Sequence, residues 1–583
     1  MFKKTDDAQQ ASLFGSPSEL LSNRSKKKYS DPTSWHNVFH KHVIWNIDEA
    51  LFAPVFNSTI GAPNYSVKVL LGMMIIKEVL ECSDKQLFEH CEFNLLVRSA
   101  LGLVNIDDLL PAESTYYLFR QRVYEYKYEG GIDLFEKVFQ TITKKQISDF
   151  NVSGKILRMD STLIGSNIAS YSRYELIHLA TQQFYKGIPE KILKKRMSRK
   201  DRETLGELLK EERNTVVYRS TREELRERMD QFGQLIYRLL RLNKSNPHHD
   251  VLQKIFEEQY EKIDGGVALR DWEERKASSV QSPDDPDCNY RNKNGQKVKG
   301  YSANVTETCS DDQLNIVTDI QLDKANTQDN TYLKNAIIQS KEVTGELADK
   351  VHCDGAYHSP SNTTFSKLIN IDLVLTGING KAGRYDLLMT DDGLQVTDRQ
   401  TGEISMAVKV ATTKGIKWRF KSPTCYRYFT QKDIDNVIIR NNLNNRLQED
   451  LSRRNNVEAT MFVFGHSCIN GKSRYRKILP NRAWAYTRGL AINIKRICKY
   501  IETTCQRTQA IACLYDTYSF FNLWLSNFYN HWSKKELLNP NCIINRNNAI
   551  LLFAPYRSGL TNKPINNPQF INRCLLITLV KKY

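Results

Sequence analysis

The sequence predicts an α/β protein in which an all-α N-terminal region precedes a mixed sheet that is interrupted by insertions. Three observations predict this fold class. Apolar residues follow a helical period from about residue 46 to 150, strand-like runs lie on both sides of a highly charged helical stretch, and a second strand-rich segment precedes the last helices. The chain has 583 residues, enough for two to four domains at about 150 residues each.

The N-terminal part divides into a polar segment and a helical one. Residues 1–45 carry three consecutive lysines, Lys26 to Lys28, and show little apolar periodicity. We expect a flexible basic arm there, which is either a contact to DNA or a solvated tail. Residues 46–150 predict a compact helical domain with a break near Ser83 and a further helix from about Ser114.

Residues 151–533 are predicted to form the domain that contains the sheet. A β-hairpin or a pair of short strands is expected over residues 155–168. The stretch 171–275 is highly charged and helical, with an apolar stripe that a long helical hairpin would bury, so we interpret it as an insertion. Residues 381–430 are β-prone and predict a second insertion. No pattern is assigned to the tail, residues 534–583.

Between the insertions the predicted elements follow a definite order. Strands are expected at 299–308 and 315–322, a helix at 328–343, a strand that ends at Asp354, and a last strand at 371–376. This order of strands and helices resembles a ribonuclease-H-like (RNase H-like) core, a mixed sheet with helices on both faces.

The charge balance favours a polyanionic partner. Lys and Arg number 83 against 66 Asp and Glu, a formal net charge of +17. Basic surface gains affinity for phosphates from counterion release. A membrane surface would also attract this charge, but the sequence has no apolar stretch of about 18 residues and no signal-peptide core. The cysteines form no Cys-x2-Cys pair, so we expect reduced thiols in a cytoplasmic protein.

Three carboxylates are candidates for a divalent-cation site. Asp160 lies in a strand-like apolar run, Asp354 ends another short run, and Glu458 lies in a helical pattern. Two-metal phosphoryl transfer needs carboxylates that bridge and flank two hard cations about 3.5–4 Å apart. For any one of these acids alone, a buried side chain that accepts backbone hydrogen bonds is an equally good interpretation.

The acids stand in a series of short motifs. These are Met159-Asp160-Ser161-Thr162, then Ser282 to Asp287 leading to Lys299-Gly300-Tyr301, then Cys353-Asp354-Gly355-Ala356-Tyr357, then Asn456-Val457-Glu458-Ala459 with Phe462. The series resembles the bacterial insertion-sequence DDE transposases, and more narrowly their IS-four-like superfamily. The segment from Tyr65 to Arg122 is similar to the N-terminal transposase helical domain that accompanies this group.

The resemblance implies a function and a chemistry. It implies an RNase H-like catalytic domain with two Mg²⁺ or Mn²⁺ ions per active site, cleavage at terminal inverted repeats, and transfer of the cut strand to target DNA. Asp160, Asp354 and Glu458 match the catalytic, metal-binding acids of the family. It also implies that the helical domain 46–150 binds double-stranded DNA, and that a homodimer acts on DNA in the bacterial cytoplasm, at the nucleoid.

The superfamily has a Tyr-x2-Arg-x3-Glu-x6-Lys signature around its glutamate, and this sequence matches it in part. Arg454 fits the arginine, but Leu451 replaces the tyrosine and Gly465 stands at the position of the lysine. We expect DNA contacts from six basic residues: Arg120, Arg122, Arg454, Lys472, Arg474 and Arg476. The basic run from Lys191 to Arg202 is either a further DNA surface or a solvated helix face.

Two rival functions remain open. One is a metal-dependent DNA nuclease on the same core that cleaves without joining. The other is a catalytically inactive descendant of a transposase that keeps only its affinity for DNA. The presence of all three acids favours an enzyme over the second rival, and joined products from pre-cut ends would exclude the first.

Overall fold

The computed structural model forms two compact units, Met1–Thr504 and Cys505–Tyr583. The residues that it describes are 1–5, 17–57, 61–105, 107–274, 276–293, 295–310, 314–377, 383–413, 415–422, 425–445, 453 and 455–536. Among them, every helix is too short or too polar to span a membrane. The tail after residue 536, to which the sequence assigned no pattern, lies outside the described residues.

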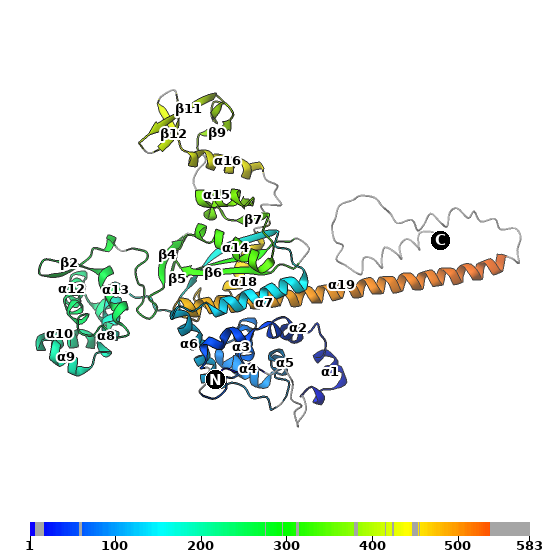
Figure 1. Cartoon of the computed structure of the whole chain (residues 1–583), viewed down its shortest axis with the longest axis horizontal. Helices are drawn as coiled ribbons and strands as arrows, with labels where there is room; N and C mark the ends of the chain where they lie inside the picture. Colours follow the sequence, from blue (N-terminus) through cyan, green and yellow to red (C-terminus); the bar gives the residue numbers. More distant parts are fainter. Residues whose placement is uncertain are drawn as a thin grey trace. The chain divides into compact units, whose positions relative to one another are not determined.

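The N-terminal part of the first unit is helical (Figure 1). Its α-helices are α1 Asn23–Tyr29, α2 Trp35–His42, α3 Val67–Leu80, α4 Asp84–Phe93, α5 Leu95–Leu101, α6 Glu113–Tyr128 and α7 Leu134–Phe150. Short 3-10 helices are η1 Pro17–Leu20, η2 Ile44–Asn46 and η3 Glu49–Val55. The predicted break near Ser83 is confirmed, because Ser83 caps α4 and forms a reciprocal capping box with Gln86.

The expected flexible arm over residues 1–45 is wrong in its second half. Helices α1 and α2 lie there, and Val38 and Phe39 of α2 are 1% and 0% exposed. Helix α2 packs against α5 and α7. Val38 and Phe39 stand among histidines and polar residues, so the sequence shows no clear helical period of apolar residues. The stability of this helix comes from tertiary packing.

A six-stranded mixed sheet forms the centre of the first unit. Its strands are β1 Ile156–Gly165, β4 Asn289–Lys293, β5 Gln296–Thr308, β6 Val317–Lys324, β7 Lys350–Cys353 and β8 Asp372–Leu375. The order is β4-β5-β1-β7-β8, and β6 pairs with β5. Strand β1 runs antiparallel to β5 and parallel to β7, which runs parallel to β8.

Strand β1 corrects the expected hairpin or strand pair over residues 155–168. It is a single strand that pairs with β5 without interruption from Leu157 opposite Thr308 to Gly165 opposite Gly300. The polar residues at its middle resemble a turn in the sequence. Their backbone groups are instead bonded to a neighbouring strand that lies far away in the sequence.

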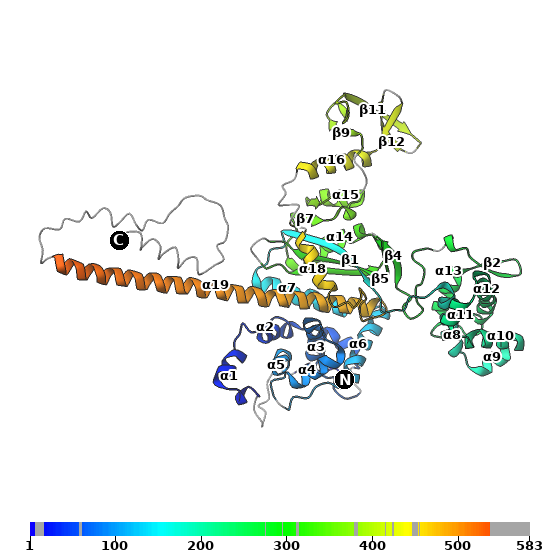
Figure 2. The same ribbon diagram turned by 180° about the vertical axis from the view of Figure 1, so that it is seen from behind.

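Helices cover both faces of this sheet (Figures 1 and 2). Leu157 and Met159 of β1 share a core cluster with α14 Leu333–Thr344 and α15 Pro360–Leu368. The 3-10 helices η5 Asp329–Thr331 and η6 Gly355–Tyr357 border these elements. On the other face lie α7, α18 Asn455–Gly465 and the start of α19 Ile478–Glu536. The predicted helix, acid-bearing strand and final strand are therefore confirmed.

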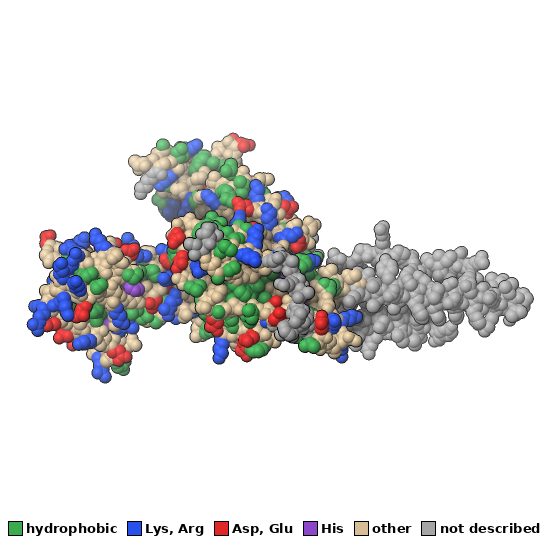
Figure 3. Space-filling model, turned by 60° about the horizontal axis from the view of Figure 1, so that its bottom comes forward, with side chains coloured by type: hydrophobic (Ala, Val, Ile, Leu, Met, Phe, Trp, Pro, Cys, Tyr) green, Lys and Arg blue, Asp and Glu red, His purple; other side chains and the backbone are tan. Residues whose placement is uncertain are grey.

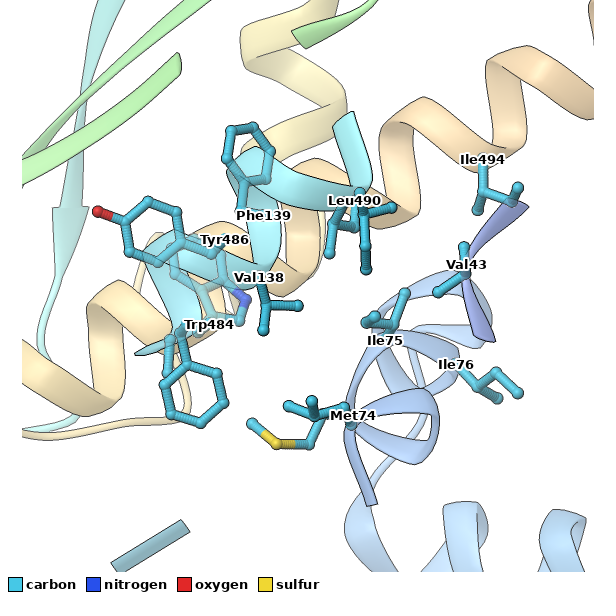
Figure 4. Packing of buried hydrophobic residues seen from close by; sticks show 14 of the residues in the cluster. Val43, Met74, Ile75, Ile76, Val138, Phe139, Trp484, Tyr486, Leu490 and Ile494 are labelled. Atoms are coloured by element: carbon cyan, nitrogen blue, oxygen red, sulfur yellow. The ribbon is translucent and has the colours of Figure 1, made fainter. Parts of the chain in front are cut away.

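The N-terminal helices and the sheet share one hydrophobic core. Figure 4 shows Met74 and Ile75 of α3 near Trp484 and Leu490 of α19, with Val138 of α7 between the two helices. All of these side chains are buried. The helical region is therefore part of the same packed body as the sheet.

The two predicted insertions are present, but the first buries its apolar stripe in a bundle of six helices and not in one long helical hairpin. The first contains α8 Arg173–Lys186, α9 Glu190–Arg196, α10 Arg199–Lys210, α11 Arg213–Arg219, α12 Arg222–Leu239, α13 His249–Gln259, β2 Tyr260–Ile263, β3 Gly266–Leu269 and η4 Trp272–Glu274. Its predicted stripe is confirmed, since Phe232, Ile236 and Leu239 are buried in a separate core. The helical prediction is wrong after residue 259, where the β2–β3 hairpin follows.

The second insertion is a five-stranded antiparallel sheet. Its strands are β9 Tyr385–Thr390, β10 Gly393–Asp398, β11 Ile404–Thr412, β12 Gly415–Lys421 and β13 Tyr426–Phe429. Helix α16, Gln431–Asn445, packs against it through Ile434 and Val437. The β-rich segment predicted over 381–430 is confirmed by these strands.

Candidate active site

Two of the three predicted acids lie on neighbouring parallel strands. Asp160 is within β1, and Asp354 directly follows β7. The two strands pair in register from Ile156 opposite Lys350 to Arg158 opposite His352. Continued by two residues, this register brings Asp160 beside Asp354.

The local backbone holds both carboxylates. Asp160 accepts a hydrogen bond from the backbone N–H of Ser161 at 2.8 Å, and Asp354 accepts one from that of Gly355 at 2.6 Å. Both side chains are half-buried. These bonds orient both carboxylates relative to the backbone.

The third acid lies on a helix that covers the same face of the sheet. Side chains two residues apart on a strand share a face, so Asp160 faces the same way as Arg158, toward α18. Helix α18 packs against β1 and turns Val457 and Thr460 inward, at 0% and 2% exposure. Glu458, between them, is exposed on the flank of the helix.

The described residues contain no group of three His, Cys, Asp or Glu side chains placed to hold a metal ion. Strand register thus places Asp160 and Asp354 toward the same end of neighbouring strands, and Glu458 lies on the helix that covers β1. The donor set consists of carboxylate oxygens only, the ligands that hard cations such as Mg²⁺ and Mn²⁺ prefer. The residues fit such a cation in their chemistry.

Tyr357 lies in the core that Leu157 and Met159 of β1 share with α14 and α15. Its hydroxyl donates a hydrogen bond to Oδ1 of Asn304 at 2.6 Å, and Asn304 pairs with Ser161 across β5 and β1. Burial, followed by the negative charges of Asp160 and Asp329, raises the pKa of Tyr357 well above its ordinary value. Tyr357 is therefore a neutral hydrogen-bond donor at all physiological pH values.

A buried ionic network joins the elements that carry the acids. Glu307 of β5 is 0% exposed and accepts hydrogen bonds from Arg158 at 2.5 Å, Arg496 at 2.6 Å and Thr460 at 2.9 Å. Arg496 also donates to Thr460 at 2.6 Å. Because Arg158 is two residues from Asp160 and Thr460 is two residues beyond Glu458, the network fixes α18 against β1.

Sequence reasoning did not find Glu307 or Asn304. Both stand in the alternating run of β5, where a polar side chain resembles the solvent-facing half of a strand. The partners of Glu307 lie 149, 153 and 189 residues away in the sequence. A buried acid with partners this distant has no recognisable pattern in the local sequence. Its two arginines approach it only in the folded protein.

The predicted DNA-contact residues have different surroundings. Arg454 lies outside the described residues. The guanidinium of Arg120 is stacked among the rings of Tyr116, Tyr117 and Tyr475 at 5.6, 6.0 and 5.2 Å from their centroids. These contacts occupy Arg120 inside the protein, where it joins α6 to the segment before α19. We do not retain it as a DNA contact.

Arg122 and Arg474 also have different surroundings from one another. Arg122 is exposed, with its guanidinium 5.9 Å from the ring centre of Phe56. Arg474 donates to the backbone carbonyls of Glu81 and Cys82 and so closes the C-terminal end of α3. Carbonyls at a helix end need such donors, and this structural role was not foreseen from the sequence.

Lys472 and Arg476 lie on the surface beside the end of β1. Lys472 Nζ donates to the carbonyl of Ile168 at 2.7 Å, and Arg476 Nε donates to that of Asn167 at 2.8 Å. Both side chains are exposed. Arg476 also forms an ion pair with Asp284 at 3.7 Å.

Lys and Arg side chains gather on the surface of the helical insertion (Figure 3). Exposed basic residues of α9 and α10 in this region are Lys191, Lys194, Lys195, Arg196, Arg199 and Lys200. Two of them form ion pairs one helical turn apart, Lys194 with Glu190 and Arg199 with Glu203, each at 2.7 Å. These side chains of the predicted basic run are thus on the protein surface, and a role in DNA binding stays a prediction.

Comparison with known protein families identifies the N-terminal helices. A family model described as a transposase domain (DUF772) matches residues 28–122. Searches of curated proteins and of solved structures gave no match. The matched segment runs from the end of α1 into α6 and contributes α3 to the core that it shares with the sheet. Residues 28–122 are thus similar to a transposase domain, a finding that is consistent with an insertion-sequence transposase.

Proposed function

We propose that the protein is a DNA transposase that cleaves at the terminal inverted repeats of an insertion sequence and joins the ends to target DNA. The observation that carries this proposal is the combination of a transposase domain with two acids that follow the paired residues of the neighbouring parallel strands β1 and β7. The net charge of +17 suits a polyanionic substrate.

We further propose that the sheet domain is RNase H-like and belongs to the IS-four-like superfamily of DDE transposases. The strand order supports this proposal, because the strand bearing Asp160 is central, antiparallel to β5 and parallel to β7. The order of elements along the chain also agrees with the order that the sequence pattern predicted, with β4 as an additional strand. The proposed catalytic acids are Asp160, Asp354 and Glu458.

In this proposal the three acids hold two Mg²⁺ or Mn²⁺ ions. When bound, such ions lower the pKa of a coordinated water and offset charge on the phosphate that reacts. Asp160 and Asp354 contribute carboxylates that their backbone hydrogen bonds keep oriented. The network at Glu307 holds α18 in place on the face of the sheet that carries Arg158 and Asp160.

The reaction consists of two phosphoryl transfers. Water attacks the phosphodiester at the end of the element, and the bond to the 3′ oxygen breaks to give a 3′-hydroxyl and a 5′-phosphate. That hydroxyl then attacks a phosphodiester of the target DNA and displaces a second 3′-hydroxyl. Two ends must react, so we propose a homodimer on double-stranded DNA, acting at the bacterial nucleoid.

Cleavage by matched aspartate variants tests this function. The full-length protein, Mg²⁺ and DNA carrying the inverted repeats that flank its gene are incubated, and nicked and cut products are counted. Asp160→Ala is expected to reduce cleavage by at least about 100-fold, the upper end of the loss for a residue that only supports a metal ligand. Asp349→Asn is the control, because Asp349 directly precedes β7, at the opposite end of this strand from Asp354, and its side chain is 70% exposed.

The outcomes separate the three candidate functions. Joined products from pre-cut ends and target DNA support the transposase, and cleavage without joining supports the nuclease. Binding of DNA with neither reaction supports the inactive descendant. Full metal-dependent cleavage by Asp160→Ala would show that the proposed site is not the active site.

A further inference from the structure

A groove lies at the far end of β1 from the acids. It has a volume of about 290 Å³ and is formed by the end of β1, the β4–β5 hairpin and the turn before α19. The turn is bonded to β1, because the N–H of Gly165 donates to Gly471 at 2.8 Å and the N–H of Ser473 donates to Gly165 at 2.8 Å. The groove is therefore held by the main chain on two sides.

Three lysines and no acidic residue line the groove. They are Lys297, Lys299 and Lys472, accompanied by Tyr290 and Gln296. Tyr290 stands opposite Lys299 in the β4–β5 register. Ammonium, phenol and amide N–H groups all donate hydrogen bonds, so the lining suits an anion with several acceptor oxygens.

Two of these ammonium groups are held by bonds to one short segment of the chain. Lys299 Nζ donates to Ser170 Oγ at 3.1 Å and to the carbonyl of Tyr171 at 3.5 Å, and Lys472 Nζ donates to Ile168 at 2.7 Å. Both lysines thus meet the same short segment, residues 168–171. Two ammonium groups that bond to one short segment at the groove suit an anion that accepts hydrogen bonds from both.

We propose that this groove binds a phosphate of the DNA backbone, away from the reacting bond. This inference rests on the proposed function and adds a contact site to it. The assignment commits to a phosphodiester of duplex DNA, because Lys472 and Lys297 are exposed at the rim and a continuous strand can pass over them. Contacts of this kind orient DNA without reading its sequence.

The position of the groove sets where on the DNA the contact falls. Asp160 pairs with Val305 in β5, and residues 297 and 299 of the same strand have the parity of Val305, so they point to the same face. Gly165 is five residues beyond Asp160 on β1, roughly 16 Å at about 3.3 Å per residue. At about 3.4 Å of duplex axis per phosphate, the contact falls about five nucleotides from the bond that is cut.

The first test measures DNA affinity as a function of salt. Full-length variants Lys297→Gln, Lys299→Gln and Lys472→Gln are titrated with a duplex containing the end of the element. Each is expected to lower the slope of log K against log salt by about 0.9 and to weaken binding equally on unrelated duplexes. Lys341→Gln, at an exposed position on α14, is the matched control and should keep the wild-type slope.

A charge-preserving variant excludes a folding defect. Lys299→Arg is expected to keep the wild-type slope because it retains the positive charge. Lys299→Gln removes this charge and is expected to lower the slope. Equal slopes for Lys299→Gln, Lys472→Gln and Lys341→Gln would overturn the groove assignment. If the wild-type chain binds and cleaves DNA while those slopes are equal, only this assignment fails; if it binds no DNA, the proposed function fails as well.

The second test locates the contact and identifies the source of the phosphate. A neutral methylphosphonate replaces one phosphate of the DNA at a time. The replacement about five nucleotides from the cut is expected to weaken DNA binding by the wild type but not by Lys299→Gln. Titration with inorganic phosphate, followed by NMR of the lysine Nζ groups, is the other arm. Tight binding of inorganic phosphate with no effect of any methylphosphonate would show a small-anion site and overturn the proposal.

Discussion

At the scale of single residues, Glu81 connects the transposase domain to the helices that cover the sheet. It ends α3 in a left-handed conformation at φ 56°, which a side chain other than glycine rarely adopts. Its carboxylate accepts from His466 at 2.8 Å, Arg488 at 2.9 Å and Lys495 at 3.4 Å. The ion pairs with these partners offset the cost of the left-handed backbone conformation at Glu81.

The titration of Glu81 predicts a pH dependence of stability. Burial raises its pKa, but the bonds from His466 and Arg488 outweigh that effect and lower the pKa to about 2. A carboxyl whose pKa is lower in the folded state stabilises the fold above its unfolded pKa, about 4.5, and loses this contribution as the pH falls to 2. Glu81→Gln should lower the free energy of unfolding by up to about 1 kcal/mol at pH 7, because the ion pairs of Glu81 are partly exposed.

Denaturant unfolding at pH 7 and pH 3 measures this effect. The free-energy difference between wild type and Glu81→Gln should shrink at pH 3, and Glu92→Gln, an exposed site on α4, should show no such change. A constant difference at both pH values would mean that the ion pairs of Glu81 do not contribute.

Gly300 explains the middle of the Lys299-Gly300-Tyr301 motif in physical terms. A Cβ at this position would clash with the backbone of β1 at Ile164 and Gly165. Gly300→Ala is therefore expected to push β1 away from β5 and to cost about 1–3 kcal/mol of stability, as overpacking does. Ala substitution at Gly206, where a Cβ meets nothing within 4 Å, is the control. Equal melting temperatures for the two variants would contradict the close approach.

At the scale of elements, the network around Glu307 fixes α18 on the sheet. Replacement of this buried carboxylate leaves Arg158 and Arg496 without their shared acceptor. Glu307→Gln should lower the free energy of unfolding by about 3–5 kcal/mol, the usual cost of breaking a buried ion pair. Hydrogen exchange should speed up in α18 more than in α14. Stability equal to that of Glu342→Gln, an exposed position of α14, would contradict this role.

Elements with a strong period were predictable from the sequence, and those that depend on distant contacts were not. The strand before Asp354 and the helix of Glu458 follow from local patterns, and the structure has both. Helix α2 and the uninterrupted β1 were missed because tertiary packing and the pairing with β5 determine them. The candidate acids were found from their motifs, whereas Glu307 required the fold.

At the scale of the whole molecule, the transposase domain and the sheet are expected to unfold together. They share one core, in which Ile75 of α3 and Leu490 of α19 are each 1% exposed. Ile75→Ala should cost about 2–5 kcal/mol. It should shift one calorimetric transition that includes the sheet, while the insertion with its own core keeps its transition. A transition of the N-terminal helices alone would contradict the shared core.

The central claim is that Asp160 and Asp354 belong to one metal-binding site. Calorimetric titration of Mn²⁺ into the wild type, Asp160→Asn, Asp354→Asn and the double variant tests it directly, with Asp349→Asn as control. The account predicts that each single variant loses most of the affinity and that the double variant loses little more, because neighbouring ligands of one ion are not independent. Wild-type affinity in either single variant, or effects of the two substitutions that simply add, would contradict it.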